Sequence, residues 1–414
     1  MRFSVKIAAL AAGISLLAAS AAQAVEIQYW QYVYDTRVKA MDELIKNFEA
    51  ANPDITVKQT TFPYDDYQTK VIAAHAAGNG PDVLQFYYGW LDKFQKGGVL
   101  QALDPAVFPN AEIEKDFFPI VSAISRDGKY YGLPTAVRSL ALFYNKNILK
   151  DAGITEPPKT LDELVADAKK TVKTDGGGNI TSEGITLDFG GQDHQWWREV
   201  LVRQFGGVPY DDKGNVAYNS DAGIKALTWY TDLATKEKVG ALGFMDEGQA
   251  AFKGGLAAFT IDGTFRLGSF KPITDFEWGV TELPANAEGV KSNFASYFAN
   301  GISADTSGDK KAAAEKFLQY VTSPEAMQIW LKTVGELPAR REAALTDANL
   351  NDPIYAPFLK ALDYAHTTTF VDEAAQRQGA IDMVNRVVLN GQSPADSIAE
   401  AAKAEQAVID KAKQ

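Results

Sequence analysis

The chain has 414 residues, with 41 lysines and arginines against 53 aspartates and glutamates, and it contains no cysteine. An acidic chain without a basic run is excluded from the usual binders of nucleic acids and of anionic membranes. The missing thiols exclude a disulfide framework and any lipid attached at a cysteine. At about 100–200 residues for each domain, the length predicts two or three domains.

The first 24 residues have the three parts of a secretory signal peptide. Arg2 and Lys6 form a positive start, residues 7–19 are apolar, and Ala22-Gln23-Ala24 is typical of a cleavage site. The apolar stretch is too short for an uncleaved membrane anchor, and no later stretch reaches about 18 uninterrupted apolar residues. We therefore expect cleavage before Val25 and a location in a bacterial periplasm, without a lipid anchor.

The segment after this leader alternates between strand and helix patterns. Short β-rich runs are separated by runs with helical spacing and by short loops, which predicts a β-α-β-α-β unit with a parallel sheet. In such sheets ligands lie beyond the C-terminal ends of the strands. The expected strands are residues 26–30, 55–61 and 81–86, and the expected helices are residues 36–51 and 65–77.

A turn-prone segment, Gly132-Leu133-Pro134, directly precedes the β-rich run of residues 139–144. We expect the chain to leave one lobe here and to enter another, so that this run is the first strand of the second lobe. Arg138 lies on the crossing. Because a charge in such a seam needs acceptors, the guanidinium contacts either a ligand or an acid of the other lobe.

The second half of the chain alternates less regularly. Thr160-Leu-Asp-Glu163 has the pattern of a capping box. We expect the chain to return to the first lobe near residues 278–284, to cross again near residues 322–324, and to be helical from Ala374 onward. Further strands are expected at residues 184–189, 257–261 and 294–302, and further helices at residues 196–205, 222–235, 245–253 and 310–321.

Eight short segments carry a family resemblance when they are taken in order. They are NPDITV, AAGNGPDV, GGVLQALD, DGKYYGLP, LFYNKNILKDAGI, PPKTLDEL, AFKGGLAAFTIDGTF and GELPARREA. In this order the chain resembles the family 1 extracellular solute-binding proteins, the maltose-binding-protein-like sugar receptors of ABC importers. The resemblance covers the chain from about Ile27 to Ala344.

This resemblance implies an α/β periplasmic-binding-protein fold, in which a hinge of several crossings joins two α/β lobes around a ligand cleft. Lobe 1 is expected to comprise residues 25–134 and 283–322, and lobe 2 residues 135–282 and 323–414. The resemblance also implies a small-molecule carbohydrate ligand, a transmembrane permease as partner, and neither catalysis nor a cofactor. We expect a monomer.

A sugar offers flat apolar ring faces and hydroxyl edges, so its site needs aromatic rings beside carboxylate, amide and arginine groups. We selected candidates at the expected strand ends, at the crossing, in the His-Gln-Trp-Trp cluster, and at positions where relatives contact ligand. The candidates are Gln31, Tyr34, Asp65, Phe86, Tyr88, Arg138, His194, Gln195, Trp196, Trp197, Asp262, Thr264, Phe265, Ser296, Tyr297 and Arg340.

Several candidates have a structural alternative. Asp65 is equally explained as a helix cap, Phe86 as a core residue, and Arg340 as a capping residue. Only one of the paired tryptophans is expected to stack on a sugar ring. Phe265 stands where relatives carry tryptophan, and Tyr297 stands where many carry glycine, which predicts a shorter pocket. Two arginines in reach suit a uronate, sulfonate or phosphate substituent as readily as a neutral sugar.

Two other classes of protein were considered. Asp262 with Asp65 or Asp188 could form the carboxylate pair of a glycoside hydrolase, although no G-x-S-x-G, H-E-x-x-H or C-x-x-C motif occurs. A structural or adhesive protein is disfavoured because the chain has no internal repeats. The three histidines lack the spacing of metal ligands, so no metal is expected.

Overall fold

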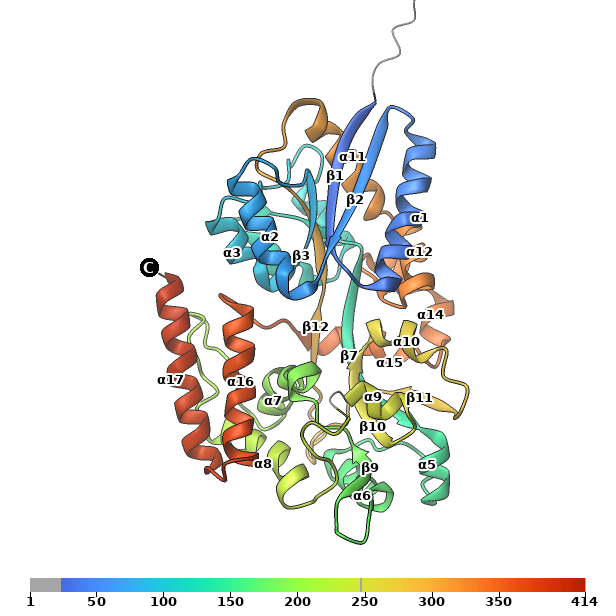
Figure 1. The fold of residues 1–414 in the computed structure, drawn as a ribbon, viewed down its shortest axis with the longest axis vertical. Coiled ribbons are helices and arrows are strands. Elements are labelled where there is room, and N and C mark those ends of the chain that lie inside the picture. Colours follow the sequence, from blue (N-terminus) through green and yellow to red (C-terminus); the bar gives the residue numbers. More distant parts are fainter. Residues whose placement is uncertain (1–23, 246–247, 414) are drawn as a thin grey trace, which may run out of the picture.

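The computed structural model describes residues 24–245 and 248–413. Apart from Ala24, the expected leader lies outside the described residues, and so do Asp246 and Glu247 of the helix expected at residues 245–253. The described chain forms two lobes along the long axis of the molecule, each with a sheet and helices packed on it (Figure 1). The lobes meet at a waist through which the chain passes several times.

The first lobe is built on a five-stranded sheet with the order β2-β1-β3-β13-β6. β1 is parallel to β2 and to β3, which confirms the predicted β-α-β-α-β unit. β13 is antiparallel to both of its neighbours. The strands are β1 (Val25–Tyr32), β2 (Ile55–Phe62), β3 (Val83–Tyr87), β6 (Leu133–Pro134) and β13 (Phe298–Ile302).

Helices cover both faces of this sheet, and α1 has the pattern of a core-facing helix. Its buried side chains include Met41, Leu44, Ile45 and Phe48, which recur at intervals of three and four residues and so share one face. The other elements of this lobe are α1 (Asp35–Ala51), α2 (Tyr64–Ala76), η1 (Tyr88–Trp90), α3 (Leu91–Lys96), α4 (Asn110–Asp116), η2 (Pro119–Ile124), β4 (Ser125–Arg126), β5 (Lys129–Tyr130), α11 (Gly308–Val321) and α12 (Pro324–Val334).

The second lobe is organised around one long strand, β7 (Ala136–Asn145), which pairs antiparallel with β10, β11, β12 and β14 along its length. A parallel pair joins β10 to β9, so the predicted strand at residues 184–189 is observed earlier in the chain, at Ile180–Ile185. The strands are β8 (Lys173–Thr174), β9 (Ile180–Ile185), β10 (Ala257–Gly263), β11 (Trp278–Thr281), β12 (Asn293–Ser296), β14 (Leu337–Pro338) and β15 (Ala365–His366).

Helices and short helical turns surround this sheet. The predicted capping box is present, because the Thr160 hydroxyl accepts from the Glu163 N–H while the Glu163 carboxylate accepts from the Thr160 N–H. The elements are α5 (Lys146–Asp151), α6 (Leu161–Thr171), η3 (Phe189–Asp193), η4 (Trp196–Leu201), α7 (Val202–Gln204), α8 (Asp221–Thr235), α9 (Gly248–Lys253), η5 (Thr264–Arg266), α10 (Leu267–Phe270), α13 (Arg341–Ala344), α14 (Asp347–Asn351), α15 (Ala356–Ala361), η6 (Leu362–Tyr364), α16 (Glu373–Val388) and α17 (Pro394–Lys413).

The second crossing lies later in the chain than the sequence predicts. β11 still pairs with β7, and so does β12, whereas β13 belongs to the first sheet. The chain therefore crosses at Tyr297, and residues 283–296 belong to the second lobe rather than to the first. Residues 294–302 form one β-rich run, and its turn-prone pair Asn300-Gly301 lies inside β13 rather than at the break at Tyr297, so the pattern predicts one strand where the pairing makes two.

The expected third crossing at residues 322–324 is also placed differently. Ser323 is the N-cap of α12, which stays on the first lobe beside α1. The chain enters the second lobe afterwards, where the Ser139 hydroxyl of β7 donates to the carbonyl of Phe358 in α15 at 2.8 Å. A Ser-Pro helix start resembles a hinge in sequence because both need an extended residue before proline.

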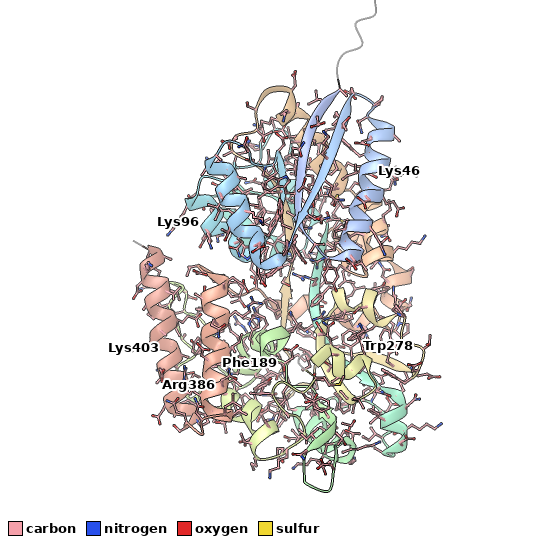
Figure 2. The ribbon with its side chains drawn as sticks, viewed as in Figure 1. Lys46, Lys96, Phe189, Trp278, Arg386 and Lys403 are labelled. Atoms are coloured by element: carbon pink, nitrogen blue, oxygen red, sulfur yellow. The ribbon has the colours of Figure 1, made fainter. Side chains whose placement is uncertain are left out.

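The helical tail packs on the outside of the second lobe, as expected from its sequence. α16 and α17 lie side by side against α8, and Arg386 and Lys403 mark them in Figure 2. The end of α17 also reaches the first lobe, because Lys96 of α3 hydrogen-bonds to the carbonyl of Ala412. Among the described helices, none combines the length and the apolar character needed to cross a membrane.

Candidate ligand-binding site

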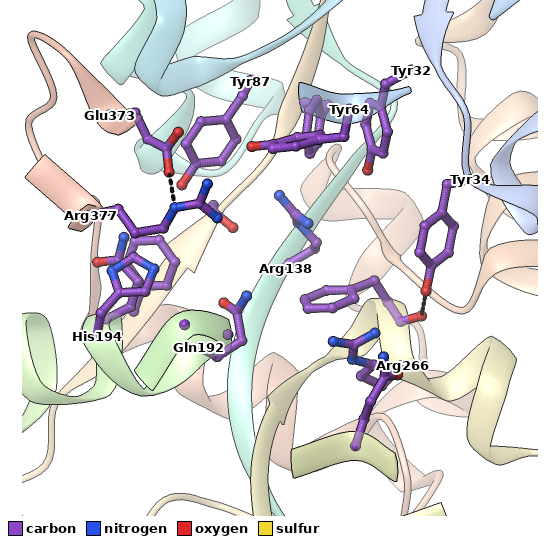
Figure 3. A pocket seen from close by; sticks show the side chains of 18 of the residues that line it. Tyr32, Tyr34, Tyr64, Tyr87, Arg138, Gln192, His194, Arg266, Glu373 and Arg377 are labelled. Atoms are coloured by element: carbon purple, nitrogen blue, oxygen red, sulfur yellow. Dashed lines mark hydrogen bonds and ion pairs between the residues drawn. The ribbon is translucent and has the colours of Figure 1, made fainter. Parts of the chain in front are cut away.

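A cavity of about 630 Å³ lies between the two lobes. Its walls come from the ends of β1 and β3, the starts of α1, α2 and α16, strands β7, β12 and β13, and the turn that precedes η4 (Figure 3). The lining residues are Tyr32, Val33, Tyr34, Arg37, Tyr64, Tyr87, Arg138, Asp188, Gly190, Gly191, Gln192, His194, Gln195, Gln249, Phe265, Arg266, Phe294, Ser296, Phe298, Glu373 and Arg377.

Aromatic rings form the wall on the side of the first lobe. The Tyr32 ring lies 5.1 Å from that of Tyr64 and 4.8 Å from that of Phe298, measured between centroids. Tyr87 stands beside Phe298 at 5.4 Å. Because β1 and β3 are parallel, their C-terminal ends bring these rings to one edge of the sheet. Flat faces of this kind match the apolar faces of a sugar ring.

Polar groups form the wall on the side of the second lobe, around the glycine-rich turn before η4. The Asp188 carboxylate accepts the N–H of Gly191 at 2.8 Å and so holds the turn. His194 is buried, and burial together with nearby arginines keeps its pKa well below the usual value, so its ring is neutral at pH 7. Gln195 accepts from the Thr368 hydroxyl at 2.7 Å. Amide and imidazole groups of this kind hydrogen-bond to hydroxyl groups.

Four arginines reach the cavity, and acids accompany all of them. Arg266 contacts Asp262 at 2.5 Å, and Arg377 contacts Glu373 at 3.5 Å. Arg37 and Arg138 both face Glu336, a buried carboxylate behind the wall. Burial alone would raise the pKa of Glu336, but the two guanidinium groups outweigh it and hold that pKa below its usual value.

The structure brings six of the sixteen predicted residues to the cavity wall. They come from both lobes and from the crossing between them, and they include one cation, three polar side chains and two rings. They are Tyr34, Arg138, His194, Gln195, Phe265 and Ser296. Their contact with a ligand stays a prediction. Tyr34 also closes one end of the cavity, since its hydroxyl donates to the carbonyl of Phe265 at 3.4 Å.

Three predicted residues at strand ends are replaced by a neighbour, because successive side chains of a strand point to opposite faces. β1 continues to Tyr32, so Tyr32 faces the cavity while Gln31 is buried and donates to Gln59. In the same way Tyr87 lines the cavity, and Phe86 before it and Tyr88 after it are buried. The prediction for Phe86 as a core residue was the correct alternative.

Trp196 and Trp197 are core residues in this structure, which contradicts the expectation that one of them stacks on a sugar. Both are 0% exposed, and neither lines the cavity. The Trp196 ring packs edge-on against Trp229 at 5.5 Å, and the Trp197 ring against Tyr218 at 5.1 Å. The segment packs against α8 and β12, and the side chains of residues 196–202 are all buried.

Asp65 and Arg340 also lie away from the cavity. Asp65 is exposed in the first turn of α2 and makes no capping hydrogen bond, although a carboxylate there still favours the helix. Arg340 forms an ion pair with Asp116 at 2.8 Å and donates to the carbonyl of Thr322. Its role is therefore to tie segments of the first lobe together.

The other three misplaced candidates are buried behind the wall. Asp262 supports Arg266 from below, and Thr264 is 0% exposed. Tyr297 points into the first lobe, where its hydroxyl donates to the carbonyls of Ile120 and Val121. It therefore does not shorten the pocket.

Most of the charged side chains that line the cavity were not predicted from the sequence. Arg37, Arg266, Glu373 and Arg377 lie on helical segments that read as ordinary solvated faces, and no local motif marks them. Arg37 meets Glu336 from 299 residues away, which only the folded chain reveals. One signal was available for Arg266, because it follows the candidate Asp262 closely, just after the end of a predicted strand.

Comparisons with known proteins place this architecture in context. A maltotriose-binding protein of Pyrococcus abyssi is 25% identical over 352 residues, which are 82% of this chain and 72% of that protein. An sn-glycerol-3-phosphate-binding periplasmic protein of Escherichia coli is 25% identical over 356 residues, covering 81% and 78%.

Solved structures give the fold its name. The ABC substrate-binding protein of Listeria monocytogenes in complex with cycloalternan has a TM-score of 0.78 and 24% identity, covering 92% of this chain and 97% of that one. The GacH receptor of Streptomyces glaucescens has a TM-score of 0.80 and 23% identity, covering 93% and 98%. The two lobes therefore form a periplasmic-binding-protein fold. Because residues 43–357 match the sequence profile of the bacterial extracellular solute-binding proteins, the chain belongs to that family.

Proposed function

We propose that this protein is the periplasmic receptor of an ABC importer, which binds a mono- or oligosaccharide, or a sugar derivative, between its lobes and delivers it to a membrane permease. One observation carries the proposal: the cavity has aromatic rings on one wall, such as Tyr64 and Tyr87, and hydrogen-bonding amides on the other, such as Gln192 and Gln195. A sugar needs both kinds of wall. Two of the proteins reported above are named for, or solved with, a carbohydrate, maltotriose and cycloalternan, and this supports a carbohydrate ligand. The expected signal peptide supports the location.

A thermal-shift screen over mono-, di- and trisaccharides, both neutral and acidic, tests this proposal. A ligand that binds only the folded state raises stability by about 2.7 kcal/mol when its concentration is 100 times its Kd. Calorimetry on the hits then gives affinity and stoichiometry, and we expect one site in each monomer. If no sugar in the panel raises the melting temperature of the protein, the proposal is contradicted.

Paired variants connect binding to this cavity. Phe265→Ala removes a ring from the wall, and we expect a loss of about 2 kcal/mol of binding free energy because aromatic anchors dominate such sites. Phe276→Ala removes a ring of the same lobe that lies outside the cavity, and we expect ligand affinity to stay unchanged. Equal losses in the two variants would place the ligand elsewhere.

The geometry gives no support to a glycoside hydrolase. Asp262 belongs to both possible pairs, with Asp65 and with Asp188, and it is buried against Arg266 behind the cavity wall. Asp65 is exposed on α2 away from the cavity, so neither pair has both carboxylates at the cavity. Incubating the protein with oligosaccharides and analysing the mixture by chromatography tests this point. We expect the oligosaccharides to be recovered unchanged.

A further inference from the structure

The corner of the cavity formed by Arg37 and Arg138 carries more positive charge than its neighbours balance. Both guanidinium groups face the single carboxylate of Glu336, which Arg37 contacts directly and which lies 3.7 Å from Nε of Arg138. Elsewhere on the wall, Arg266 and Arg377 each have a carboxylate of their own. Among the residues that the structure describes, the pairing therefore leaves one positive charge in excess at this corner.

Several donors at this corner have no acceptor. Nε and Nη1 of Arg37 and Nε of Arg138 are buried without a hydrogen-bond partner among the described residues. Arg37 is 1% exposed, so water does not satisfy it freely. A buried donor without a partner costs free energy, and the cost is recovered when an acceptor arrives.

Aromatic rings hold the two guanidinium groups in place. Arg37 lies over the rings of Tyr32 and Phe298, at 5.2 and 4.9 Å from their centroids. Arg138 lies over the rings of Phe265 and Phe298, at 5.1 and 5.0 Å. These contacts orient the planar donors without neutralising them. In Figure 3 the Arg138 side chain stands in the middle of the cavity, with Tyr64 above it.

The other charged groups around the cavity do not cancel this excess. His194 is neutral, and Glu373 is occupied by Arg377. Asp188 belongs to the turn of the second lobe, where it accepts the N–H of Gly191. An anion at the Arg37–Arg138 corner therefore finds both charge and free donors.

We infer that this corner is a subsite for an oxyanion, a carboxylate or a phosphate, carried by the sugar. The inference rests on the proposed function and narrows its substrate class to acidic sugars. The planar guanidinium of Arg138 donates to two oxygens of the anion, and the excess charge of the corner balances the charge of the solute. The aromatic wall then receives the ring of the sugar.

Matched solutes test the subsite. Glucuronate and glucose 6-phosphate are compared with glucose and methyl glucoside by calorimetry on the wild-type protein at low ionic strength. We expect at least one acidic probe to bind about tenfold or more tightly than its neutral counterpart. We expect the advantage to shrink as salt is added.

Variants of Arg138 assign the effect to this corner. Arg138→Gln removes the charge, so we expect the acidic probe to lose about tenfold or more in affinity, and a neutral probe to change by less than about threefold. Arg138→Lys keeps the charge without the planar fork and should fall between the two. Arg340→Gln, which breaks an ion pair outside the cavity, is the matched control and should leave both affinities unchanged.

Each outcome has a distinct meaning. If neutral sugars bind and the acidic ones do not, the acidic subsite is overturned and the sugar receptor stands. The same holds if Arg138→Gln lowers the affinity for the acidic and the neutral probe equally. If glycerol 3-phosphate or succinate binds, Arg138→Gln weakens that binding, and no sugar binds, the anion subsite is supported and the sugar receptor is overturned. Binding of no anion at all overturns the subsite.

Discussion

Glu183 of β9 is a carboxyl group without enough partners for its charge. It is 1% exposed, its Oε1 accepts the N–H of Ala241 at 2.9 Å, and its Oε2 has no partner in the described part of the chain. Burial raises the pKa of Glu183 to about 8, so the group is protonated near pH 7. The same cause raises the pKa of Asp193, deeper in the same lobe, to about 8.

We therefore expect the protein to lose stability as the pH rises from about 7 to about 8. In this range the folded state still keeps the protons of Glu183 and Asp193 while the unfolded state has already released them, so the free energy of unfolding falls. At lower pH the buried His194, whose pKa is lowered, contributes with the opposite sign. Each group contributes a slope of up to about 1.4 kcal/mol for one pH unit. Denaturant unfolding of the wild type at several pH values measures the slope.

Glu183→Gln keeps the acceptor for Ala241 and removes one titrating group, so its stability should vary less with pH than that of the wild type. The exposed Glu288→Gln is the control and should follow the wild type. A wild-type stability that rises over this range would contradict the assignment.

The helical segment formed by η4 and α7 is buried on all sides. The side chains of residues 196–202 are buried, including the charged Arg198 and Glu199. Arg198 pairs with Glu405 of α17 at 3.2 Å, so the tail closes the far side of the segment. An element enclosed on every side supports the cavity wall from behind and does not contact the ligand itself.

Trp196→Ala should therefore change stability rather than recognition. Emptying a fully buried tryptophan site costs about 3–5 kcal/mol of unfolding free energy. The affinity of the folded fraction for ligand should stay close to that of the wild type. Trp278→Ala, at a half-buried ring of β11, serves as control and should cost less. If Trp196→Ala kept its stability and lost ligand binding, Trp196 would be a residue that contacts the ligand.

In the whole molecule, several chain segments pass from one lobe to the other beside the cavity. The links include β6 to β7, β12 to β13, and the segment between α12 and α15. Segments of this kind absorb rotation while the sheets stay rigid. The hydrogen bond between Tyr34 and Phe265 crosses from one lobe to the other at the edge of the cavity.

We expect the lobes to close further on ligand, since a bound sugar bridges both walls. Small-angle scattering should show a smaller radius of gyration with saturating ligand than without it. A sugar that gives no thermal shift is the control and should leave the radius unchanged. A radius that stays constant in the presence of a tightly bound ligand would exclude closure.

Features that depend on near neighbours in the chain could be predicted from local patterns. The β-α-β-α-β unit, the first crossing after Pro134 and the capping box of Thr160 and Glu163 all follow from patterns within a few residues. The family and the class of protein follow from the order of such segments. These features were predicted because short loops and local hydrogen bonds leave few alternatives.

Most of the side chains that reach the cavity could not be predicted from local patterns, because their orientation depends on how the whole chain folds. β1 continues two residues beyond its predicted end at Trp30, so Tyr32 faces the cavity and Gln31 is buried. Packing against α8 buried Trp196, and Arg37 found Glu336 from the other end of the chain. The physical reason is that orientation depends on strand register and on contacts between distant segments, and neither leaves a mark in a short stretch of sequence.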